Sequence, residues 1–327
     1  MPKAVRFHQL GGPEVLKIED VTLRQPGEGE IALKVAAVGL NRAESMYFHG
    51  RYMEQPELPS GIGYEAVGTV TAVGHGIDSN IVGRQFGMIP GYSMNKFPAL
   101  AEEAIVPYYA LAELSPSLSI VEGAAVWMQY CTAYGALIGL SRIGRGDFVI
   151  VTAASSSVGL AAIQIARAEG ATAIATTRTS AKKQQLIDLG AHHVIATQEE
   201  DLPARVNEIT AGKGARVVFD PVGGDYVSTL AQATASEGTI YLYGMLSGQP
   251  TPYPMTGFVK GVALTGYTFG LMNTPERWEA MKRYIYSRLA DGTFKPKIDR
   301  VFAFADVVDA YKYLESNAQV GKIVITF

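Results

Sequence analysis

The sequence predicts an α/β protein in which a doubly wound, six-stranded parallel sheet follows a β-rich part. Two observations indicate this fold. Roughly the first 120 residues contain short, β-branched runs bounded by glycine, of which 30–40 and 66–74 are the clearest, and such runs are typical of barrel-like strands. From residue 147 onward, apolar runs alternate with helical patterns, which implies parallel strands covered by helices on both faces.

The expected elements follow one another closely along the second half of the chain. Strands are expected at 147–153, 171–177, 192–196, 216–220, 239–244 and 262–269, with helices at 158–170, 180–190, 201–212 and 225–235. A long helix is expected over 119–143, where apolar residues recur at helical spacing after a capping serine, and another near 275–290. A last helix and strand, 305–316 and 322–327, are expected to return to the first part.

The composition restricts the class of protein. A net charge of −3 and a pI near 6.0 give no electrostatic indication of nucleic-acid binding. The single cysteine, Cys131, excludes an intrachain disulfide and a Cys-rich zinc knuckle, and it fits a reducing compartment. The first residues lack the apolar core of a signal peptide, and no apolar run is long enough to span a membrane. We therefore expect a cytoplasmic protein without a membrane partner.

The segment 150–166 has the position of a dinucleotide-binding strand, turn and helix. Small residues let the backbone approach a pyrophosphate, and the helix N-terminus offers free N–H groups and a positive dipole end. Because two of the three usual glycines are missing, a plain serine-rich helix cap remains the alternative. The residues that stand for Gly-x-Gly-x-x-Gly are Ala154, Ser155, Ser156, Ser157, Val158 and Gly159.

The end of the next strand selects the dinucleotide. An acidic residue there would bind a ribose 2′-hydroxyl, but the sequence reads TTRTSAKK over 176–183. Thr177, Arg178 and Lys182 offer a hydroxyl and two cations, which suit a 2′-phosphate and favour NADPH over NADH. The alternative is that the lysines only solvate a helix face, and this alternative is strongest for Lys183.

Five segments together resemble the zinc-independent, zeta-crystallin-like quinone oxidoreductase branch of the medium-chain dehydrogenases/reductases. They are VGLNRAESMYFHGRY (38–52), LPSGIGYEAVGTV (58–70), AASSSVGLAAIQIARAEGA (153–171), VVFDPVGG (217–224) and VGKIVITF (320–327). The resemblance covers essentially the whole chain. It implies a Rossmann NADPH-binding domain over 124–269 and a GroES-like, β-barrel-type catalytic domain formed by 1–123 and 270–327. It also implies a homodimer, in which a strand such as 262–269 pairs across a two-fold axis.

The same resemblance assigns roles to individual residues. Asn41 and Tyr52 match polar groups beside the nicotinamide, and Tyr64 is a further candidate donor. Thr132 matches a nicotinamide-side hydroxyl, and Gly244 ends a strand whose backbone faces the ring. The other residues placed with the cofactor are Lys182 as a 2′-phosphate ligand, Val222, Asn317 and Lys322. The chain departs from the pattern at Met46, Thr197 and Asn317, where relatives carry Tyr, Tyr and Arg respectively.

The expected site holds no metal. Asn41 and Tyr64 stand where zinc-bearing relatives have Cys and His, and Asn and Tyr are poor zinc ligands. Hydrogen-bond donors, first Asn41 and Tyr52, are then expected to stabilise charge on a carbonyl oxygen, whereas Glu44 and Glu65 are expected to hold loops or backbone groups.

The resemblance predicts NADPH-dependent hydride transfer to a small hydrophobic substrate, either a quinone or the activated C=C of an α,β-unsaturated carbonyl. Two alternatives remain. One is a zinc-type alcohol dehydrogenase that acts on alcohols or aldehydes. The other is a non-catalytic NADPH-binding protein, crystallin-like or nucleic-acid-binding.

Overall fold

The computed structural model describes residues 1–327 and divides them into two compact units. Unit 1 comprises 1–128 and 296–327, and unit 2 comprises 129–295. The divisions therefore fall after residues 128 and 295 rather than after 123 and 269. The chain returns to unit 1 later than expected because helix α8 (Pro275–Ala290) belongs to unit 2. Tyr284 and Arg288 of this helix contact Glu169 of the same unit at 2.8 and 2.7 Å.

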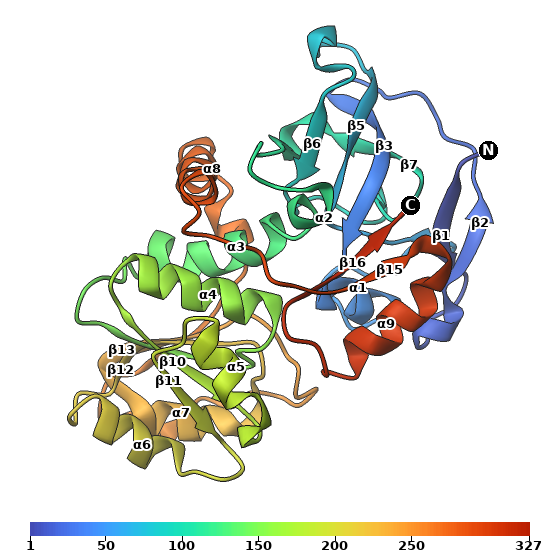
Figure 1. Cartoon of the computed structure of the whole chain (residues 1–327). Coiled ribbons are helices and arrows are strands. Elements are labelled where there is room, and N and C mark those ends of the chain that lie inside the picture. Colours follow the sequence, from blue (N-terminus) through green and yellow to red (C-terminus); the bar gives the residue numbers. More distant parts are fainter. The chain divides into compact units, whose positions relative to one another are not determined.

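Unit 1 is built from two sheets. Its strands are β1 (Lys3–Phe7), β2 (Lys17–Asp20), β3 (Glu30–Gly39), β4 (Ser60–Gly61), β5 (Ala66–Val73), β6 (Gln85–Met88), β7 (Glu103–Pro107), β8 (Leu111–Glu113), β15 (Ile298–Ala303) and β16 (Lys322–Thr326). The small sheet has the order β2-β1-β4, and the large one has the order β15-β16-β3-β5-β6-β8 with β7 also paired to β3. All pairs are antiparallel except β15 with β16. Figure 1 shows the red C-terminal strand β16 beside the blue strand β3, with which it pairs.

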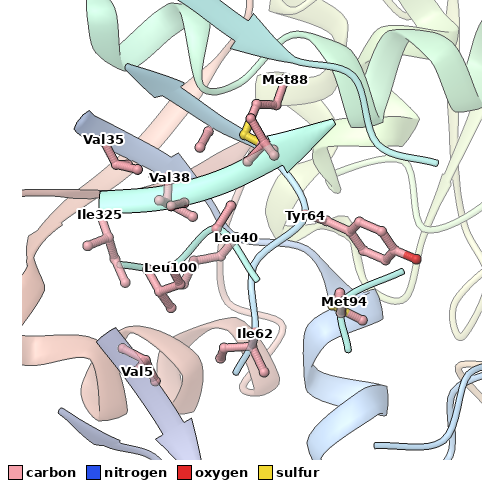
Figure 2. Close-up of a cluster of buried hydrophobic side chains, with 14 of the residues drawn as sticks. Val5, Val35, Val38, Leu40, Ile62, Tyr64, Met88, Met94, Leu100 and Ile325 are labelled. Carbon is pink, nitrogen blue, oxygen red and sulfur yellow. The ribbon is translucent and has the colours of Figure 1, made fainter. Parts of the chain in front are cut away.

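The main core of unit 1 lies between these sheets and two short helices, α1 (Arg42–Phe48) and α9 (Val307–Glu315), whereas α2 (Ile120–Gly123) packs against a smaller apolar cluster. Residues that alternate along β3, such as Val35, point into one apolar cluster with Leu40 and Ile325. Figure 2 shows the Tyr64 ring beside Met94 at the edge of this cluster, with its hydroxyl directed away from the aliphatic side chains. The core therefore fixes the ring and leaves the phenol oxygen at its margin.

Unit 2 holds one sheet of six parallel strands. They are β9 (Phe148–Val151), β10 (Thr172–Thr177), β11 (His193–Ala196), β12 (Ala215–Asp220), β13 (Thr234–Leu242) and β14 (Ala263–Gly266). Their spatial order is β11-β10-β9-β12-β13-β14, which is 3-2-1-4-5-6 in chain order. This is the order of a doubly wound dinucleotide-binding sheet, and ligands bind such sheets where the strand order reverses. The expected six-stranded Rossmann sheet is confirmed.

Helices cover this sheet. They are α4 (Ser157–Ala168), α5 (Lys183–Asp188), α6 (Leu202–Ile209) and α7 (Val227–Ala233). Leu202 of α6 and Leu230 of α7 share one apolar cluster with Ile150 and Ile240 of the strands, whereas α4 packs on β9 and β10. No helix of the structure is both long and apolar enough to cross a membrane.

The single helix expected over 119–143 is wrong. The structure has α2, then α3 (Trp127–Tyr134), then a π-helical segment Gly135–Leu140. The break has a non-local cause, because the Met128 amide in the first turn of α3 donates to the Glu65 carboxylate at 3.1 Å. A carboxylate from a distant segment thus caps α3 and lets the helix begin anew at Trp127.

Candidate active site

The turn between β9 and α4 forms a backbone cradle in unit 2. Ser156 caps α4, because its hydroxyl oxygen accepts a hydrogen bond from the Gly159 amide at 3.1 Å. A Cβ on Gly159 would come within 2.7 Å of the Ala154 Cα, so glycine is required for this close approach of helix and strand. The first amides of α4 have no intrahelical partner and carry the positive end of the helix dipole. With the partly exposed Ser155, Ser157 and Val158, this turn has the form of a pyrophosphate site.

Cationic side chains follow β10 next to this turn. The Lys182 ammonium donates to the Ser155 hydroxyl at 3.5 Å, so its charge lies at the cradle. Arg178 is exposed just beyond Thr177, which ends β10. Lys183 instead forms an ion pair with Glu200 at 2.5 Å. The structure therefore separates two adjacent lysines, one directed to the turn and one committed to a carboxylate.

A buried aspartate organises the carboxyl ends of β9 and β12, and sequence reasoning missed it. Asp220 accepts hydrogen bonds from the Val222 amide at 3.2 Å and from the Thr152 hydroxyl. A Cβ on Gly244 would lie 2.8 Å from the Pro221 carbonyl oxygen, so this position also requires a bare backbone. The expected residues Val222 and Gly244 thus lie together beyond the carboxyl ends of β12 and β13, and β12 is one of the two strands between which the strand order reverses. The available signal was an aspartate at the end of an apolar strand, followed by a Gly-Gly pair.

The remaining cofactor candidates occupy different places. Thr132 is buried in α3 of unit 2. Asn317 follows α9 in unit 1, where its side-chain oxygen accepts from the Arg42 guanidinium at 2.7 Å. Asn317 is therefore engaged within unit 1.

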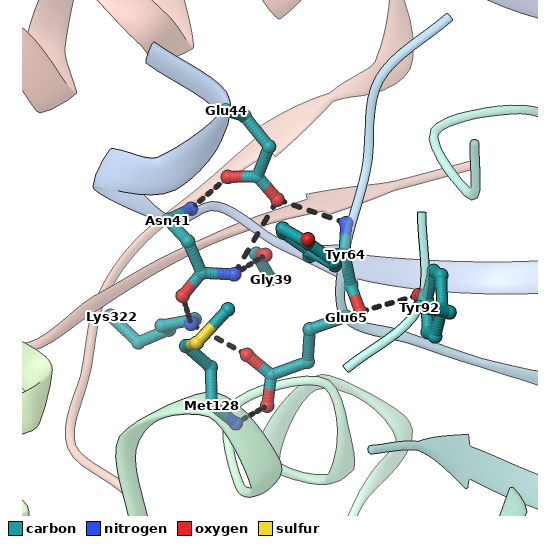
Figure 3. Close-up of polar contacts among 8 residues, drawn as sticks. All are labelled: Gly39, Asn41, Glu44, Tyr64, Glu65, Tyr92, Met128 and Lys322. Atoms are coloured by element: carbon teal, nitrogen blue, oxygen red, sulfur yellow. Dashed lines mark hydrogen bonds and ion pairs between the residues drawn. The ribbon is translucent and has the colours of Figure 1, made fainter. Parts of the chain in front are cut away.

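A polar network in unit 1 surrounds Asn41, the residue before α1 (Figure 3). The Asn41 side-chain amide donates to the Gly39 carbonyl at 3.0 Å and to the Glu44 carboxylate at 3.5 Å. Its side-chain oxygen accepts from the Lys322 ammonium at 2.5 Å. The amide expected to face a substrate oxygen is thus held by partners on both its nitrogen and its oxygen.

Lys322, which was expected among the cofactor residues, is part of this network. Its side chain is only 1% exposed, and its ammonium lies 2.6 Å from the Glu65 carboxylate. The other Glu65 oxygen accepts from the Met128 amide at 3.1 Å. Glu65 therefore holds a backbone group and a cation, in agreement with its expected holding role.

Glu44 is a second fully buried carboxyl in the network. It accepts hydrogen bonds from the Asn41 amide at 2.5 Å and the Tyr64 amide at 3.0 Å, so it also holds backbone. Burial raises the pKa of Glu44 to about 7, while the positive charge of Lys322 and these hydrogen bonds act in the opposite direction. The spacing Asn41-x-x-Glu44 is the pattern of a helix N-cap followed by an acidic N3 residue, a signal available in the sequence.

Three tyrosines form a row beside the network. The rings of Tyr52 and Tyr64 meet edge to face at 6.1 Å, and those of Tyr64 and Tyr92 at 5.5 Å. The hydroxyls of Tyr52 and Tyr64 hydrogen-bond to each other, and the Tyr92 hydroxyl donates to the Tyr64 carbonyl at 2.5 Å. Burial raises the pKa of Tyr52 and of Tyr64 above the ordinary value of 10, so both phenols stay protonated at neutral pH.

Within the described chain, no three His, Cys, Asp or Glu side chains gather in a way that could hold a metal ion. At the position where a metal-bearing relative would need ligands, Asn41 and Glu65 both contact the Lys322 ammonium. The Lys322 ammonium therefore already binds the side-chain oxygens that a metal ion would need at this position.

Sequence comparison identifies both units. The family model "Alcohol dehydrogenase GroES-like domain" matches residues 27–107, and the model "Zinc-binding dehydrogenase" matches 157–285. A quinone oxidoreductase of Salmonella typhimurium is 31% identical, with 99% of each chain covered. The chain belongs to the quinone oxidoreductase family of the medium-chain dehydrogenases/reductases. The expected fold class, a Rossmann sheet with a GroES-like domain, is thereby confirmed.

Other similar proteins give a wider comparison. A 2-haloacrylate reductase of a Burkholderia species is 27% identical over 99% of both chains. Among solved structures, the Escherichia coli quinone oxidoreductase complexed with NADPH is 30% identical and superposes with a TM-score of 0.90, covering 99% of this chain and all of the other. Both therefore extend the likeness over the full length of the chain.

Proposed function

We propose that the chain is an NADPH-dependent oxidoreductase that delivers hydride to a quinone or to the activated C=C of an α,β-unsaturated carbonyl. Family membership places it among enzymes of this class, since relatives are named quinone oxidoreductases and a 2-haloacrylate reductase. The observation that carries the cofactor choice is the contact of Lys182 with Ser155, in a chain where no acidic residue occurs in the segment 178–183 that follows β10.

The residues of unit 2 fit NADPH. Gly159 lets helix α4 pack closely against the turn after β9, and the start of α4 presents amide donors to a pyrophosphate. Arg178 and Lys182 supply the charge that a 2′-phosphate requires, with Thr177 at the strand end. A structural relative was solved in complex with NADPH. When bound, NADPH supplies the hydride, and the chain supplies orientation and proton chemistry.

Tyr52 is the proposed proton donor. It is the more accessible of the paired phenols, because Tyr64 is 8% exposed and Tyr52 is only partly buried. The hydrogen bond with Tyr64 acts to lower the pKa of Tyr52, although burial raises it overall. Tyr64 therefore stabilises the anion that Tyr52 becomes after it donates its proton.

Asn41 is proposed to orient the site rather than to act as a free donor. The donor role expected from the sequence needs an N–H directed at substrate, but the amide is engaged by Gly39 and Glu44. Through Glu44, which also binds the Tyr64 amide, Asn41 is linked to the segment that carries the tyrosine pair. The donor task at a developing oxyanion then falls chiefly to Tyr52.

The chemistry is proposed to be independent of zinc. Asparagine and tyrosine are poor zinc ligands, and the one nearby carboxylate that could serve, Glu65, has its oxygens bonded to Lys322 and to the Met128 amide. This donor set disfavours the zinc-type alcohol dehydrogenase alternative. The non-catalytic alternative is disfavoured because relatives matched over their full length are named as reductases.

We further propose a cytoplasmic homodimer. Cys131 is the only cysteine and is buried, so the chain forms no intrachain disulfide, which suits a reducing compartment. Strand β14 is an edge of the parallel sheet in unit 2, and the preceding Met255, Phe258 and Val259 are 68%, 65% and 95% exposed. An exposed edge next to apolar side chains supports pairing with a second copy.

The proposed function is tested by turnover. NADPH oxidation should be measured with panels of quinones, alkenals, cyclic enones and enoyl thioesters, beside alcohol oxidation with NADP⁺ as a comparison. We expect turnover with at least one electron-poor acceptor class and none with simple alcohols. Alcohol oxidation that exceeds every reduction, or NADPH binding without turnover of any acceptor, would contradict the proposal.

A further inference from the structure

Lys322 carries a buried charge whose presence needs an explanation. The side chains of Lys322 and Glu65 are 1% and 0% exposed, and their charged atoms lie 2.6 Å apart. A buried ion pair of this kind adds little stability over well-packed apolar residues, because both charges lose their hydration. Stability alone therefore does not account for a lysine at this position.

The contacts of the ammonium show what it fixes. An ammonium can only donate hydrogen bonds, so the Asn41 group facing it at 2.5 Å must be the amide oxygen. This directs the Asn41 nitrogen towards the Gly39 carbonyl and Glu44. Lys322 therefore selects one of the two possible orientations of the Asn41 amide.

The backbone is shaped to admit the lysine. Gly39 ends β3, and a Cβ at this position would lie 2.7 Å from the Lys322 Cε and 1.9 Å from the Ala124 carbonyl oxygen. Strand β16 lies antiparallel to β3, so Lys322 starts opposite the end of β3 and reaches Asn41 directly beyond it. The Lys322 side chain thus passes through the space that a side chain at position 39 would fill.

The links continue to the tyrosine pair. Asn41 contacts Glu44 through its backbone and side-chain amides, and the Glu44 carboxylate accepts from the Tyr64 amide at 3.0 Å. Tyr64 in turn hydrogen-bonds to Tyr52. A chain of contacts therefore runs from the ammonium to the proposed proton donor, and Figure 3 shows its part from Lys322 to Tyr64.

We propose that Lys322 is a positioning residue for the reduction: its ammonium fixes the Asn41 amide and the Glu65 carboxylate and supplies the positive charge that acts on Glu44. This inference rests on the proposed function for its kinetic effect only. The ammonium contacts the buried Glu65 carboxylate and acts electrostatically on the buried Glu44 carboxyl, so the charge balance of the site depends on Lys322. A residue with a merely structural role would not control that balance.

The charge balance has a measurable signature at Glu44. Burial raises the pKa of Glu44 to about 7, and Lys322 is the first cause that opposes this rise. Removing the ammonium should raise the Glu44 pKa further, since opposite charges nearby shift a carboxyl pKa by about 1–3 units. The other titratable side chains that act electrostatically with Glu44 are the phenols Tyr52, Tyr64, Tyr92 and Tyr311.

The test uses variants that remove the charge without stranding a partner. Lys322→Met alone leaves Glu65 buried and unpaired, so Lys322→Met/Glu65→Gln is the main variant and Lys322→Arg is the conservative one. Lys260→Met is the matched control, because this lysine bonds only the Gln232 and Thr234 carbonyls of unit 2. Thermal unfolding establishes that each variant is folded.

Two measurements on the full chain, enone kinetics and an amide titration, test whether Lys322 is a positioning residue. For enone reduction by NADPH, the double variant should lose roughly 10–100-fold in kcat, because small displacements at a reacting centre have effects of that size. Its KM for NADPH should stay within about twofold of the parent if only unit 1 is altered. Lys322→Arg should recover most of kcat, and Lys260→Met should retain all of it.

The second readout does not depend on turnover. In protein labelled with ¹⁵N-asparagine, the Asn41 side-chain amide signals should titrate with Glu44 near pH 7. The midpoint should move upward by about one pH unit or more in the double variant. A folded double variant with the parent midpoint and parent kcat would overturn the proposal. If the parent reduces no acceptor, the proposed function fails, while the amide titration still decides whether Lys322 controls this site.

Discussion

The hydroxyl groups of Tyr52 and Tyr64 are hydrogen-bonded to each other, while their rings meet edge to face at 6.1 Å. The bond acts to lower the pKa of Tyr52 and to raise that of Tyr64. Tyr52 is therefore the phenol that loses its proton at the lower cost in free energy, and it is also the more exposed of the two. This asymmetry gives the two tyrosines different expected roles.

Tyr52→Phe removes the proposed proton donor. General acid catalysis contributes about 10²–10⁴-fold, so kcat for an enone should fall by roughly 10²-fold. The effect on a quinone should be smaller, because an electron-poor acceptor needs less assistance. Steady-state kinetics with both acceptor classes and a direct measurement of NADPH affinity, which should barely change, check this expectation.

Tyr64→Phe and Tyr47→Phe are the controls for that measurement. Tyr64→Phe removes one hydrogen bond to Tyr52 and should lower enone kcat by only about tenfold, as expected for roughly 1.4 kcal/mol. Tyr47 bonds Ser60 within the core of unit 1, and its loss should affect stability rather than kcat. Parent enone rates in Tyr52→Phe would remove Tyr52 from the mechanism.

Lys182→Ala and Lys183→Ala should have different effects on cofactor choice. Lys182 contacts Ser155 at the cradle, whereas Lys183 pairs with Glu200 at 2.5 Å. A charge-assisted hydrogen bond to a 2′-phosphate is worth about 1.5–3 kcal/mol, so Lys182→Ala should weaken NADPH binding at least about tenfold. NADH affinity should not change in either variant, since NADH lacks that phosphate.

Fluorescence titration of the parent and both variants with NADPH and NADH measures these affinities. Because the two lysines are adjacent, Lys183→Ala controls for any general loss of positive charge on this surface. Equal weakening by both substitutions would mean that the lysines act through long-range charge. Equal affinity of the parent for the two dinucleotides would refute the assignment of NADPH.

The sheet of unit 2 could be predicted because its signals are local. The apolar runs 147–153 and 171–177 and the small residues after the first of them specify strand, turn and helix within a short window. The helix 119–143 could not be predicted correctly, since the capping group of α3 is the Glu65 carboxylate from another segment. Local periodicity carries no information about such a partner.

The same contrast between local and non-local signals applies to the candidate site. The cradle and the capping pattern Asn41-x-x-Glu44 are visible in consecutive residues. The position of Lys322 cannot be seen in consecutive residues, because it depends on the pairing of β16 with β3, which are far apart in the sequence. For the same reason the sequence suggested a free Asn41 amide, whereas the structure engages it with Lys322 and Glu44.

Treatment with a strong chelator should leave the protein unchanged. The expected reason is chemical: Asn41 and Tyr64 are poor ligands, and Glu65 already binds the Lys322 ammonium. Activity with a quinone or an enone and the thermal midpoint should both survive dialysis. Elemental analysis that finds one zinc per chain, together with activity lost on its removal, would contradict a zinc-independent mechanism.

The last prediction concerns the pH dependence of stability. Burial raises the pKa of Glu44 from its ordinary value of 4.5 to about 7, so the folded chain keeps a proton that the unfolded chain releases at lower pH. The contribution of Glu44 to the free energy of unfolding is therefore complete below about pH 4.5 and is lost as the pH rises through about 7. At about 1.4 kcal/mol per pKa unit, the loss should amount to about 3 kcal/mol.

Urea unfolding between pH 4.5 and 8 measures this contribution in the parent and in Glu44→Gln. The variant should be less stable at low pH, because an amide offers one acceptor oxygen where the carboxyl meets three N–H donors, from the backbone and side chain of Asn41 and from Tyr64. It should nevertheless lack the Glu44 part of the pH dependence, so the two curves should converge or cross as the pH rises. Glu57→Gln, a change to an exposed carboxylate, should leave the parent's curve shape intact. If the curves of the parent and Glu44→Gln stay parallel over the whole range, Glu44 does not titrate between these pH values, and the charge balance assigned to it and Lys322 is wrong.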